Sequence, residues 1–370
     1  MAGNQGTSGS SVASTLTSSA AAVAAKLGRS AHFLIGMGND LNDDHSMDGA
    51  YTLGTTLDLH YAYLVAYLNA DKSWGSWKDW NAGGTFINVL ADSADAKGVV
   101  PMYTMYAMAA AGDSNLAGLT DNVFEKGYWD DIKLMFQRIA VFNKPAVVQF
   151  EPDFWAYAEI QSNEAPTSMR VNLTANAADC AGLSNDLVGM GHCLVKLARM
   201  YAPKAIIGFH ASQWSATDPT ATVAFLKACG ADQADVIFAD VLDRDAGCFE
   251  AMGAGCSRVG SFYWDETNKT SPNFHEYLSW STAITSGLGR PMIWWQVPFG
   301  VPSTTKGGTA GHYRDNRVHY MFSHIDEFVA AGGLGAVFGT GADGQTYITS
   351  DGDQFKNAVG AYFKSPVAIH

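Results

Sequence analysis

The chain contains little charge and few basic residues. Only 16% of its 370 residues are charged, and 23 Lys and Arg stand against 36 Asp and Glu, which gives a formal charge of -13. A protein that binds nucleic acid needs a basic surface to contact phosphates, so this balance argues against a nucleic-acid partner. The chain also lacks any run of 18 apolar residues, so we expect no membrane-spanning helix and no membrane partner.

Sequence motifs that mark metals and nucleotides are absent as well. None of the five cysteines lies in a C-x-x-C pair, which argues against a zinc site. No G-x-G-x-x-G follows the first predicted strand and no P-loop is present, which weakens a nucleotide-binding interpretation. We therefore expect chemistry that requires no metal and no organic cofactor.

The spacing of the cysteines favours two disulfides. Cys248 and Cys256 bracket a Gly-rich loop, Cys180 and Cys193 can close a similar one, and Cys229 is then left free. Disulfides persist in oxidising compartments, so this interpretation favours a secreted or periplasmic protein. The alternative is that all five cysteines are reduced.

The N-terminal residues differ in composition from the rest of the chain. Residues 1–30 are rich in Ala, Ser, Thr and Gly, which predicts a flexible segment with a weak helix from Ala20 to Leu27. They have no basic start followed by a strong apolar run, so they are not a clear signal peptide. The whole chain is 47% hydrophobic, and residues 31–370 contain no linker, which predicts a single domain.

Short apolar runs alternate with amphipathic helical segments through this domain. The strand candidates are His32–Gly36, Thr56–Tyr63, Val99–Tyr106, Ala146–Phe150, Ala205–His210, Val236–Ala239, Met292–Gln296 and Leu334–Phe338. The alternation predicts a parallel sheet with crossover helices, and about eight strands predict a closed (β/α)8 TIM barrel. A doubly wound open sheet is the alternative fold.

The segment Lys144–Trp155 carries the strongest functional signal. Its apolar part, Ala146–Phe150, predicts a strand buried on both faces, and Pro152 ends that strand where Glu151 and Asp153 appear. Acids and aromatics at the carboxyl end of a buried parallel strand are where α/β proteins place chemistry. The structural alternative is a helix N-cap with a salt bridge.

In a barrel, the carboxyl ends of all strands surround one mouth, and most strands predicted here end in polar or aromatic residues. These residues are Asp40, His60, Tyr61, Tyr103, Tyr106, Glu151, Asp153, Trp155, His210, Gln213, Asp240, Asp243, Trp294, Trp295, Gln296 and Asp343. Any one of them can be a structural group, and the accumulation is what points to a site. Carboxylates beside aromatic platforms indicate glycoside chemistry, because cleaving a glycosidic bond needs one protonated acid and one ionised partner.

This layout resembles the TIM-barrel glycoside hydrolases, in particular the large clan whose acid/base residue follows the fourth strand. The segments that carry the resemblance are Gln149–Asp153 and Met292–Pro298. The resemblance implies that Glu151 is the general acid/base. The sequence departs from the clan at Phe150, where Asn is usual, and at Gln296, where a nucleophilic Glu is usual. An amide cannot be the nucleophile.

A second carboxylate must therefore come from another position. The candidates are Asp153, Asp240, Asp243, Asp265 and Glu266, and Asp240 is preferred because it directly ends the sixth strand. A salt bridge to Arg244 is the structural alternative for Asp240. We predict Glu151, Asp240 and Asp153 as catalytic residues. The predicted substrate-binding residues are His60, Tyr61, Tyr103, Trp155, His210, Gln213, Trp294, Trp295 and Gln296.

Together these residues predict a monomeric hydrolase of a polysaccharide, with a β-glucan such as cellulose as the preferred substrate. One alternative is a non-catalytic carbohydrate-binding barrel, which Gln296 supports. The other is a metal-dependent hydrolase, which needs His60, His210 and Asp240 to converge.

Two further features have open interpretations. The acidic loops Asp40–Asp48 and Asp240–Asp245 offer oxygens at alternating positions and are candidates for a structural Ca²⁺ site, although the first lacks the Gly and Glu of an EF-hand. The alternative is a solvated or N-capping loop. Trp74, Trp77 and Trp80 recur every three residues, a spacing that favours core packing over a sugar platform.

Overall fold

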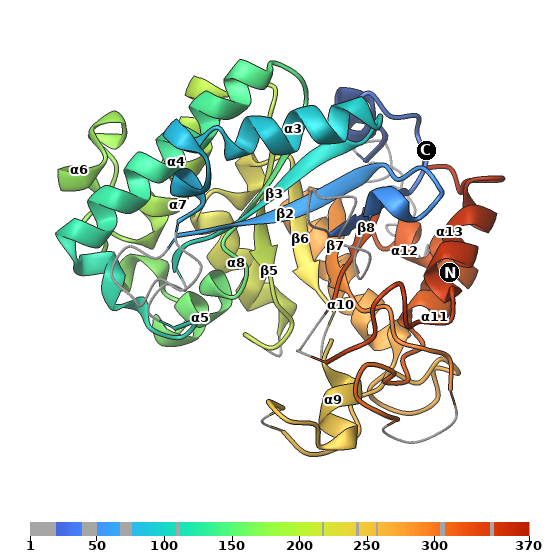
Figure 1. The fold of residues 1–370 in the computed structure, drawn as a ribbon. Coiled ribbons are helices and arrows are strands. Elements are labelled where there is room, and N and C mark those ends of the chain that lie inside the picture. The colour runs from blue at the N-terminus through green and yellow to red at the C-terminus, as the bar shows by residue number, and fades with distance from the viewer. Residues whose placement is uncertain are drawn as a thin grey trace, which may run out of the picture.

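The computed structural model describes residues 20–38, 50–66, 76–108, 112–216, 218–241, 244–256, 258–303, 308–340 and 344–369. Eight parallel strands close into a barrel in chain order, and helices surround it (Figure 1). The predicted single-domain TIM barrel is confirmed. The strands are β1 (Leu34–Gly38), β2 (Leu59–Val65), β3 (Val100–Tyr106), β4 (Val147–Phe150), β5 (Ile206–Ala211), β6 (Val236–Asp240), β7 (Met292–Val297) and β8 (Gly333–Phe338).

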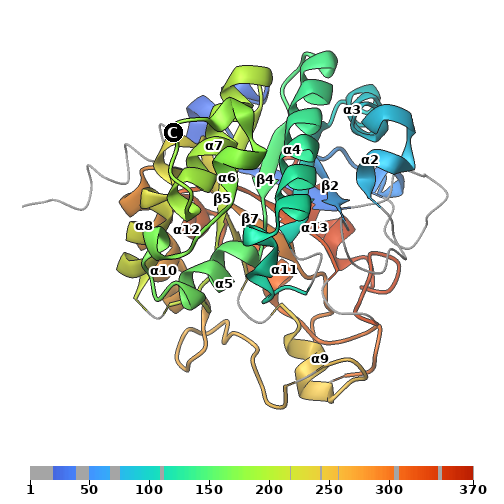
Figure 2. The same cartoon turned by 90° about the vertical axis from the view of Figure 1, so that its left-hand side faces the viewer.

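The helices lie on the outside of the barrel and in the loops at its mouth. They are α2 (Trp77–Trp80), α3 (Phe86–Ala96), α4 (Asn122–Phe142), α5 (Phe154–Gln161), α6 (Leu173–Asn176), α7 (Leu187–Tyr201), α8 (Pro219–Ala228), α9 (Ala246–Ala251), α10 (Phe274–Leu288), α11 (Arg317–Ser323), α12 (Ile325–Ala330) and α13 (Gln354–Tyr362). Helices α4 and α7 pack side by side against the barrel (Figure 2). The short helix α9 stands apart from this ring, beyond the carboxyl ends of the strands, in both ribbon views.

Some elements begin at residues other than those expected from the apolar pattern. The apolar helical spacing begins at Tyr128, but helix α4 begins earlier, at Asn122, because the Asp121 side chain caps it by accepting hydrogen bonds from Val123 N and Phe124 N. Strand β1 begins at Leu34 and not at His32, and the backbone N–H of Phe33 instead donates to Val367 O near the C-terminus. The polar caps and long-range partners set these boundaries.

Two apolar layers form the core. Alternate strand residues fill the barrel interior, among them Leu59, Met102 and Phe238, and the residues between them pack against the surrounding helices. Because both faces of each strand are covered, the strands are apolar on both sides. This is why the sequence shows them as continuous apolar runs.

The described part of the N-terminal segment is ordered. Residues 20–26 form a helix, and Val23, Ala24 and Leu27 are buried against the apolar cluster of the barrel interior. Arg29 Nη2 donates to the backbone oxygens of Asp58 and Gly98, at 3.1 and 2.6 Å. Residues from position 20 onward therefore close the amino end of the barrel and do not belong to a flexible segment.

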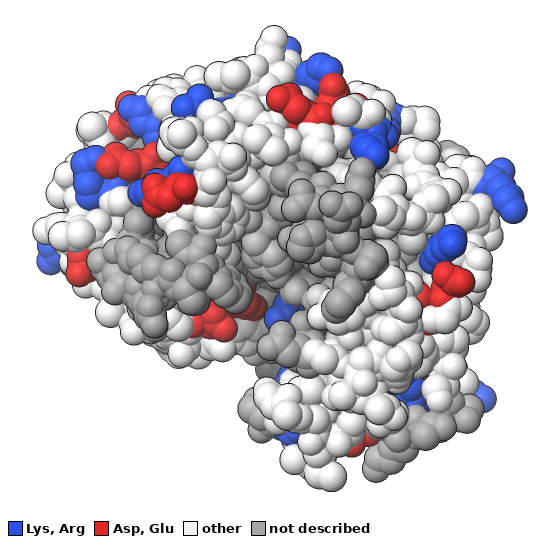
Figure 3. Space-filling view, viewed as in Figure 1, with Lys and Arg blue, Asp and Glu red and all other residues white. Residues whose placement is uncertain are grey.

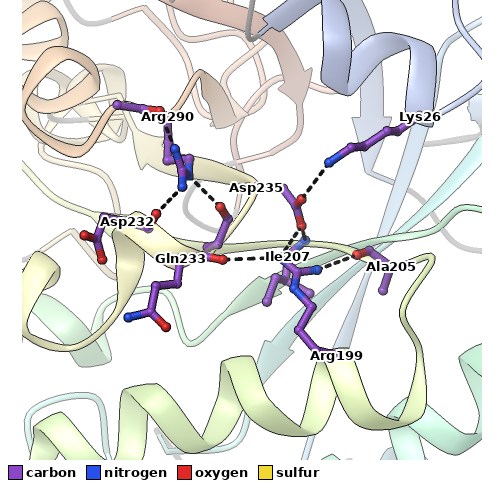
Figure 4. Close-up of polar contacts among 10 residues, drawn as sticks. Lys26, Arg199, Ala205, Ile207, Asp232, Gln233, Asp235 and Arg290 are labelled. Atoms are coloured by element: carbon purple, nitrogen blue, oxygen red, sulfur yellow. Dashed lines mark hydrogen bonds and ion pairs between the residues drawn. The ribbon is translucent and has the colours of Figure 1, made fainter.

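A polar network holds the same end of the barrel together (Figure 4). Asp235 accepts from Arg199 Nη2 at 2.9 Å and from Ile207 N at 3.1 Å, and Lys26 Nζ lies 3.4 Å from its other oxygen. Arg290 donates to the backbone oxygens of Ala234 and Asp232. The network joins the N-terminal helix, α7, β5 and β6, so this end of the barrel serves stability.

Disulfides join Cys180 to Cys193 and Cys248 to Cys256, and Cys229 is free and buried, as the spacing predicted. On the face shown in Figure 3, acidic and basic side chains lie in mixed groups separated by wide uncharged areas. In the described parts of the chain, no helix has both the length and the apolar character needed to cross a membrane.

Candidate active site

Three polar residues at the carboxyl ends of β4 and β7 have a left-handed backbone. The φ angles are 47° at Glu151, 66° at Asp153 and 53° at Gln296. Such angles are costly for residues other than glycine and persist only where surrounding contacts hold them. Because such conformations concentrate at functional sites, they direct attention to this end of the barrel.

A β-bulge in β7 sets the directions of its last side chains. The register between β7 and β8 shifts between Trp294 and Val297, which turns the Gln296 side chain towards the mouth. Gln296 Nε2 donates to Thr340 O at 2.7 Å, and Gln296 Oε1 accepts from Arg244 Nη1. The amide at the position of the expected nucleophile therefore holds a guanidinium.

A cavity of about 410 Å³ opens at the mouth, and we call it the mouth cavity. Its lining residues are Tyr63, Val65, Trp80, Tyr106, Asp153, Arg244 and Trp295. Trp80 is 40% exposed, and Trp295 packs against Tyr61 and Tyr63. Aromatic walls with a few convergent polar groups are typical of sites for small ligands and sugar units.

A chain of hydrogen bonds crosses the barrel interior beneath the mouth. Thr104 Oγ1 donates to Gln149 Oε1 at 2.8 Å, and Gln149 Nε2 lies 2.9 Å from His210 Nδ1. His210 Nε2 lies 3.3 Å from Asp240 Oδ1. These four residues come from β3, β4, β5 and β6, and all of them are buried.

The chain of hydrogen bonds determines which ring nitrogen of His210 carries the hydrogen. Gln149 Oε1 accepts from Thr104, so its Nε2 group donates to His210 Nδ1. The remaining ring nitrogen, Nε2, then carries the hydrogen and donates it to Asp240. All three hydrogen bonds therefore run in the direction of Asp240, so the hydrogen-bond chain stabilises the ionised form of that carboxyl.

The pKa values of Asp153 and Asp240 move in opposite directions. Burial raises the pKa of Asp153, and the charge of Asp240 raises it further while Arg244 opposes the rise. Burial also acts to raise the pKa of Asp240, but the hydrogen bond from His210 and the charge of Arg244 bring it below its usual value. Two carboxyls whose pKa values are moved apart in this way are suited to act as acid and base in one reaction.

Arg244 connects the polar groups of the cavity. Its guanidinium lies over the Trp295 ring, 5.8 Å from the centroid, and bonds the Gln296 amide. The carboxylates of Asp153, Asp245 and Asp240 all act on it electrostatically. A cation shared by several acids lets two carboxyls lie close together without both being forced into the protonated form.

Glu151, the predicted acid/base, is not among the described residues that line the mouth cavity. Its carboxyl is fully buried, and Oε2 accepts from the backbone N–H groups of Ala107 and Met108, both at 3.0 Å. Burial raises the pKa of Glu151 to about 8, against the effect of these two donors. The contacts identify Glu151 as a support for the backbone that follows β3.

Replacing Glu151 by Gln is expected to reduce the fall in stability between pH 4.5 and pH 8. The folded protein holds a proton on Glu151 across this window, whereas the unfolded chain has released it, because burial raises the pKa from 4.5 to about 8. The contribution of protonated Glu151 to the free energy of unfolding is complete below pH 4.5 and is lost as the pH rises through 8, by up to about 1.4 kcal/mol per pH unit. Urea unfolding at a series of pH values measures this free energy.

Glu125→Gln provides a parallel test of the same effect. Glu125 is also buried, with a pKa raised to about 8 by burial, and it accepts from Trp129 Nε1 at 2.7 Å on α4. Each substitution should remove a similar part of the slope of the free energy of unfolding against pH, and the double variant should remove roughly twice as much. A wild-type free energy of unfolding that stays constant from pH 5 to pH 8 would contradict the assignment.

Several predicted substrate-binding residues point towards the helices and not into the mouth. Tyr103 donates its hydroxyl to Ile87 O at 2.8 Å, and Trp155 donates Nε1 to Phe150 O at 3.2 Å. Trp294 packs on Phe33 and Phe328, outside the barrel. His60 Nδ1 lies 2.6 Å from Tyr51 Oη. His60, Tyr103 and Trp294 lie on the helix-facing side of their strands, because alternate strand residues face opposite sides of the sheet. Trp155 lies on α5 and is buried.

Other predicted residues lie near the mouth with different roles. Tyr61 fills the barrel interior, where a Cβ on Gly38 or Gly339 would collide with its ring. His210 supports Asp240 from below, and Gln213 is not among the described residues that line the mouth cavity. Asp153, Trp295 and Tyr106 line it directly, whereas Asp240 and Gln296 are not among its described lining residues. Asp40, Asp243, Asp343 and Trp74 lie outside the described residues, as does the loop 41–48.

The sequence interpretation did not select Tyr63, Val65, Thr104 or Arg244 as site residues. The sequence could have indicated Tyr63, because strand alternation places it on the same face of β2 as Tyr61. The tryptophan triplet is also divided: Trp77 is fully buried, and Trp80 lines the cavity. Among the residues that the structure describes, no group of three His, Cys, Asp or Glu can hold a metal ion. A Ca²⁺ ion at the two acidic loops remains a prediction.

The fold is similar to solved carbohydrate-active TIM barrels at low sequence identity. A modular endo-β-1,4-mannanase of glycoside hydrolase family 26 from Cellulomonas fimi matches with a TM-score of 0.51 and 13% identity, over 96% of this chain and 74% of that chain. An endoglucanase, Cel6, from Mycobacterium tuberculosis matches with a TM-score of 0.36 and 16% identity, over 66% of this chain and 63% of that chain. The match thus spans less than two thirds of the endoglucanase.

A sugar epimerase is also among the similar structures. The D-psicose 3-epimerase from Clostridium cellulolyticum H10 matches with a TM-score of 0.43 and 11% identity, over 90% of this chain and 97% of that chain. A scan against models of protein families found no match, and a search of curated proteins found none either. At these identities the likeness shows the fold.

Proposed function

We propose that this protein is a glycoside hydrolase that cleaves a polysaccharide with Asp153 as general acid and Asp240 as its ionised partner. One observation carries the proposal. Asp153 lines the aromatic cavity and interacts electrostatically with Asp240 at the end of β6, and their pKa values are moved in opposite directions, by burial at Asp153 and by His210 and Arg244 at Asp240. Glycoside cleavage requires one protonated acid and one ionised partner, and pKa shifts in these two directions favour that pair of states.

The reaction follows from these two states. Asp153 donates its proton to the glycosidic oxygen as the bond from that oxygen to the anomeric carbon breaks, and the bonding electrons stay on the leaving oxygen. Asp240 then either takes a proton from the water that attacks the anomeric carbon or attacks that carbon itself. In the second route, water that gives its proton to the now ionised Asp153 attacks the same carbon, breaks its bond to Asp240 and regenerates both carboxyls. In both routes the charge of Asp240 stabilises the positive charge that develops on the sugar ring.

The aromatic residues and Arg244 supply the substrate-binding surface. Trp80, which is 40% exposed, presents a flat apolar face, whereas the buried Trp295 lies beneath the Arg244 guanidinium. Tyr63, Tyr106 and Arg244 place hydrogen-bonding groups at the cavity edge. A sugar ring has both apolar C–H faces and equatorial hydroxyls, so it complements this combination. A β-glucan such as cellulose is our preferred substrate. The fold of the mannanase adds β-1,4-mannan to the polymers to be tested.

We also propose that the protein acts outside the cytoplasm as a monomer. The two disulfides support this location, because such bonds form and persist in secreted and periplasmic proteins. A soluble enzyme outside the cytoplasm has direct access to a polymer that cannot enter the cell.

Release of new reducing ends tests the proposed activity. Wild type, Glu151→Gln and Asp240→Asn would be incubated with cellulose, soluble β-glucan and β-mannan. We expect release by wild type and by Glu151→Gln, because the Glu151 carboxyl bonds backbone outside the mouth cavity, and none by Asp240→Asn. Activity in all three proteins would remove Asp240 from the mechanism, and activity lost only with Glu151→Gln would restore the original assignment.

Binding without release by wild type would instead favour the non-catalytic carbohydrate-binding barrel. The amide at Gln296 is the observation behind that alternative, although its contact with Arg244 gives it a role in the proposed enzyme. The convergence of His60, His210 and Asp240 that a metal-dependent hydrolase would need is not present. His60 contacts Tyr51, whereas His210 bonds Asp240 inside the barrel.

A further inference from the structure

A second cavity lies among the loops that follow β6 and β7. Its volume is about 570 Å³, and its walls include Tyr263, Glu266, Arg314, Asn316 and His319. Both loops leave the carboxyl ends of their strands, so this cavity lies on the same side of the barrel as the mouth cavity. These loops and α9 form the projection at the lower edge of Figure 1.

The charged groups on the walls are paired. Arg314 donates Nε and Nη2 to the two carboxyl oxygens of Glu250, both at 2.8 Å. His319 Nδ1 lies 2.8 Å from Glu266 Oε2. Asp315, which also lines the cavity, pairs with Arg317. Both arginines named here are paired with carboxylates, so they are not free to bind an anion, and this lining suits an uncharged polar ligand.

Two residues that line this cavity each have a buried polar atom with no hydrogen-bond partner among the described residues. They are Tyr263, with its hydroxyl, and Asn316, with Oδ1. A buried polar group without a hydrogen bond costs free energy, so a ligand that reaches these atoms with both a donor and an acceptor would be favoured here. Hydroxyl groups do both, and the paired carboxylates keep lone pairs that can accept from them.

The walls are held in place before any ligand binds. Asn316 Nδ2 donates to Trp264 O at 2.8 Å, which ties the two loops together. Asp315 N donates to Val301 O at 3.0 Å, and Val301 N donates to Tyr313 O at 3.1 Å. A preorganised wall lowers the entropy lost on binding.

One short segment links the two cavities. Arg244, which lines the mouth cavity, precedes α9, and Glu250, which holds Arg314 in the second cavity, lies near the end of α9. At the rise of an α-helix, six residues span on the order of 10 Å. A saccharide of several units is long enough to reach from one cavity to the other.

We propose that the second cavity binds sugar units of the same saccharide chain whose scissile bond lies in the mouth cavity. The inference rests on the proposed function for the identity of the chain. The second cavity contributes affinity for long chains and no chemistry. Loss of its contacts therefore affects long substrates and leaves short ones unchanged.

The test uses the double variant Tyr263→Phe/His319→Ala. Tyr263→Phe removes a hydroxyl that has no partner in the described structure, and the His319 side chain is 61% exposed, so neither change should unfold the protein. His275→Ala is the matched control, because His275 is equally exposed and pairs with Glu327 outside both cavities. Thermal unfolding checks each variant.

Binding is measured by calorimetry in the Asp240→Asn background, so that cleavage does not intervene. The probes are the hexasaccharides and disaccharides of β-1,4-linked glucose and mannose. We expect the double variant to bind a hexasaccharide at least fivefold more weakly than its parent and to bind the disaccharides equally well, whereas His275→Ala changes neither. On an active background, the double variant should raise KM for the hexasaccharide without lowering kcat.

Equal hexasaccharide affinity in the double variant and its parent would overturn the proposal, as would a parent that binds no hexasaccharide at millimolar concentration. Failure of the proposed function looks different. In that case wild type releases no reducing ends, while hexasaccharide binding still depends on Tyr263 and His319. The two results are therefore separable.

Discussion

Replacing Asp240 by Asn is expected to lower kcat on the polysaccharide at least about 1000-fold while the protein remains folded. Asn keeps an oxygen that can accept from His210 Nε2, so the hydrogen-bond chain through Gln149 is preserved and only the negative charge is lost. A loss of this size corresponds to about 4 kcal/mol of transition-state stabilisation. Release of reducing ends at saturating substrate measures it.

Asp130→Asn is the matched control for Asp240→Asn. It makes the same chemical change at an exposed position on α4, where Asp130 pairs with Lys126. A surface pair of this kind contributes little, so activity and thermal stability should both stay close to wild type. If Asp240→Asn keeps more than about a tenth of wild-type kcat, Asp240 is neither the base nor the nucleophile.

Replacing Asp153 by Asn is expected to lower kcat on the polysaccharide by about 100-fold to 10,000-fold, the usual effect of removing a general acid. The Asn oxygen can still accept from Tyr106 Oη, which lies 3.1 Å from Asp153 Oδ2, so the local structure should persist. The loss should be much smaller with an aryl glycoside whose leaving group needs no proton. That contrast separates an acid from a residue that only positions the substrate.

The pH profile gives a second measurement of the same role. Burial raises the pKa of Asp153, so wild-type kcat/KM should fall on the alkaline side as this carboxyl loses its proton. The pKa of Asp240 is lowered, so its ionised form persists to low pH and should set the acidic side of the profile. Asp153→Asn should abolish the alkaline fall. An unchanged alkaline limb in that variant would show that another group donates the proton.

The sequence could not tell how the side chains of Glu151 and Asp153 are directed. Both acids follow β4, and the resemblance to a known clan favoured Glu151. The left-handed φ angles at both residues direct the side chains differently: the Glu151 carboxyl bonds the backbone of Ala107 and Met108, and Asp153 enters the mouth cavity. Pro152 was visible in the sequence, but the backbone angles of its neighbours depend on tertiary contacts.

Several residues near strand ends also face a side of the sheet that the sequence did not reveal. His60, Tyr103 and Trp294 were placed at the mouth because they stand near strand ends, yet they face the helices. In a strand that is polar on one face, alternation tells which residues point inward. In a TIM barrel both faces are covered and apolar, so the sequence shows the alternation without showing which side is the interior.

The amino-acid sequence by itself determined the barrel and the two disulfide pairs, because apolar periodicity, turn residues and cysteine spacing are local properties. It also placed Asp153, Asp240 and Trp295 at strand ends. Only the tertiary structure decided which carboxyls act on one another, and which of them has its pKa raised and which has it lowered. A pKa depends on burial and on neighbours, and here those neighbours are His210, on β5 beside Asp240, and Arg244, which follows β6 and acts on both Asp240 and Asp153.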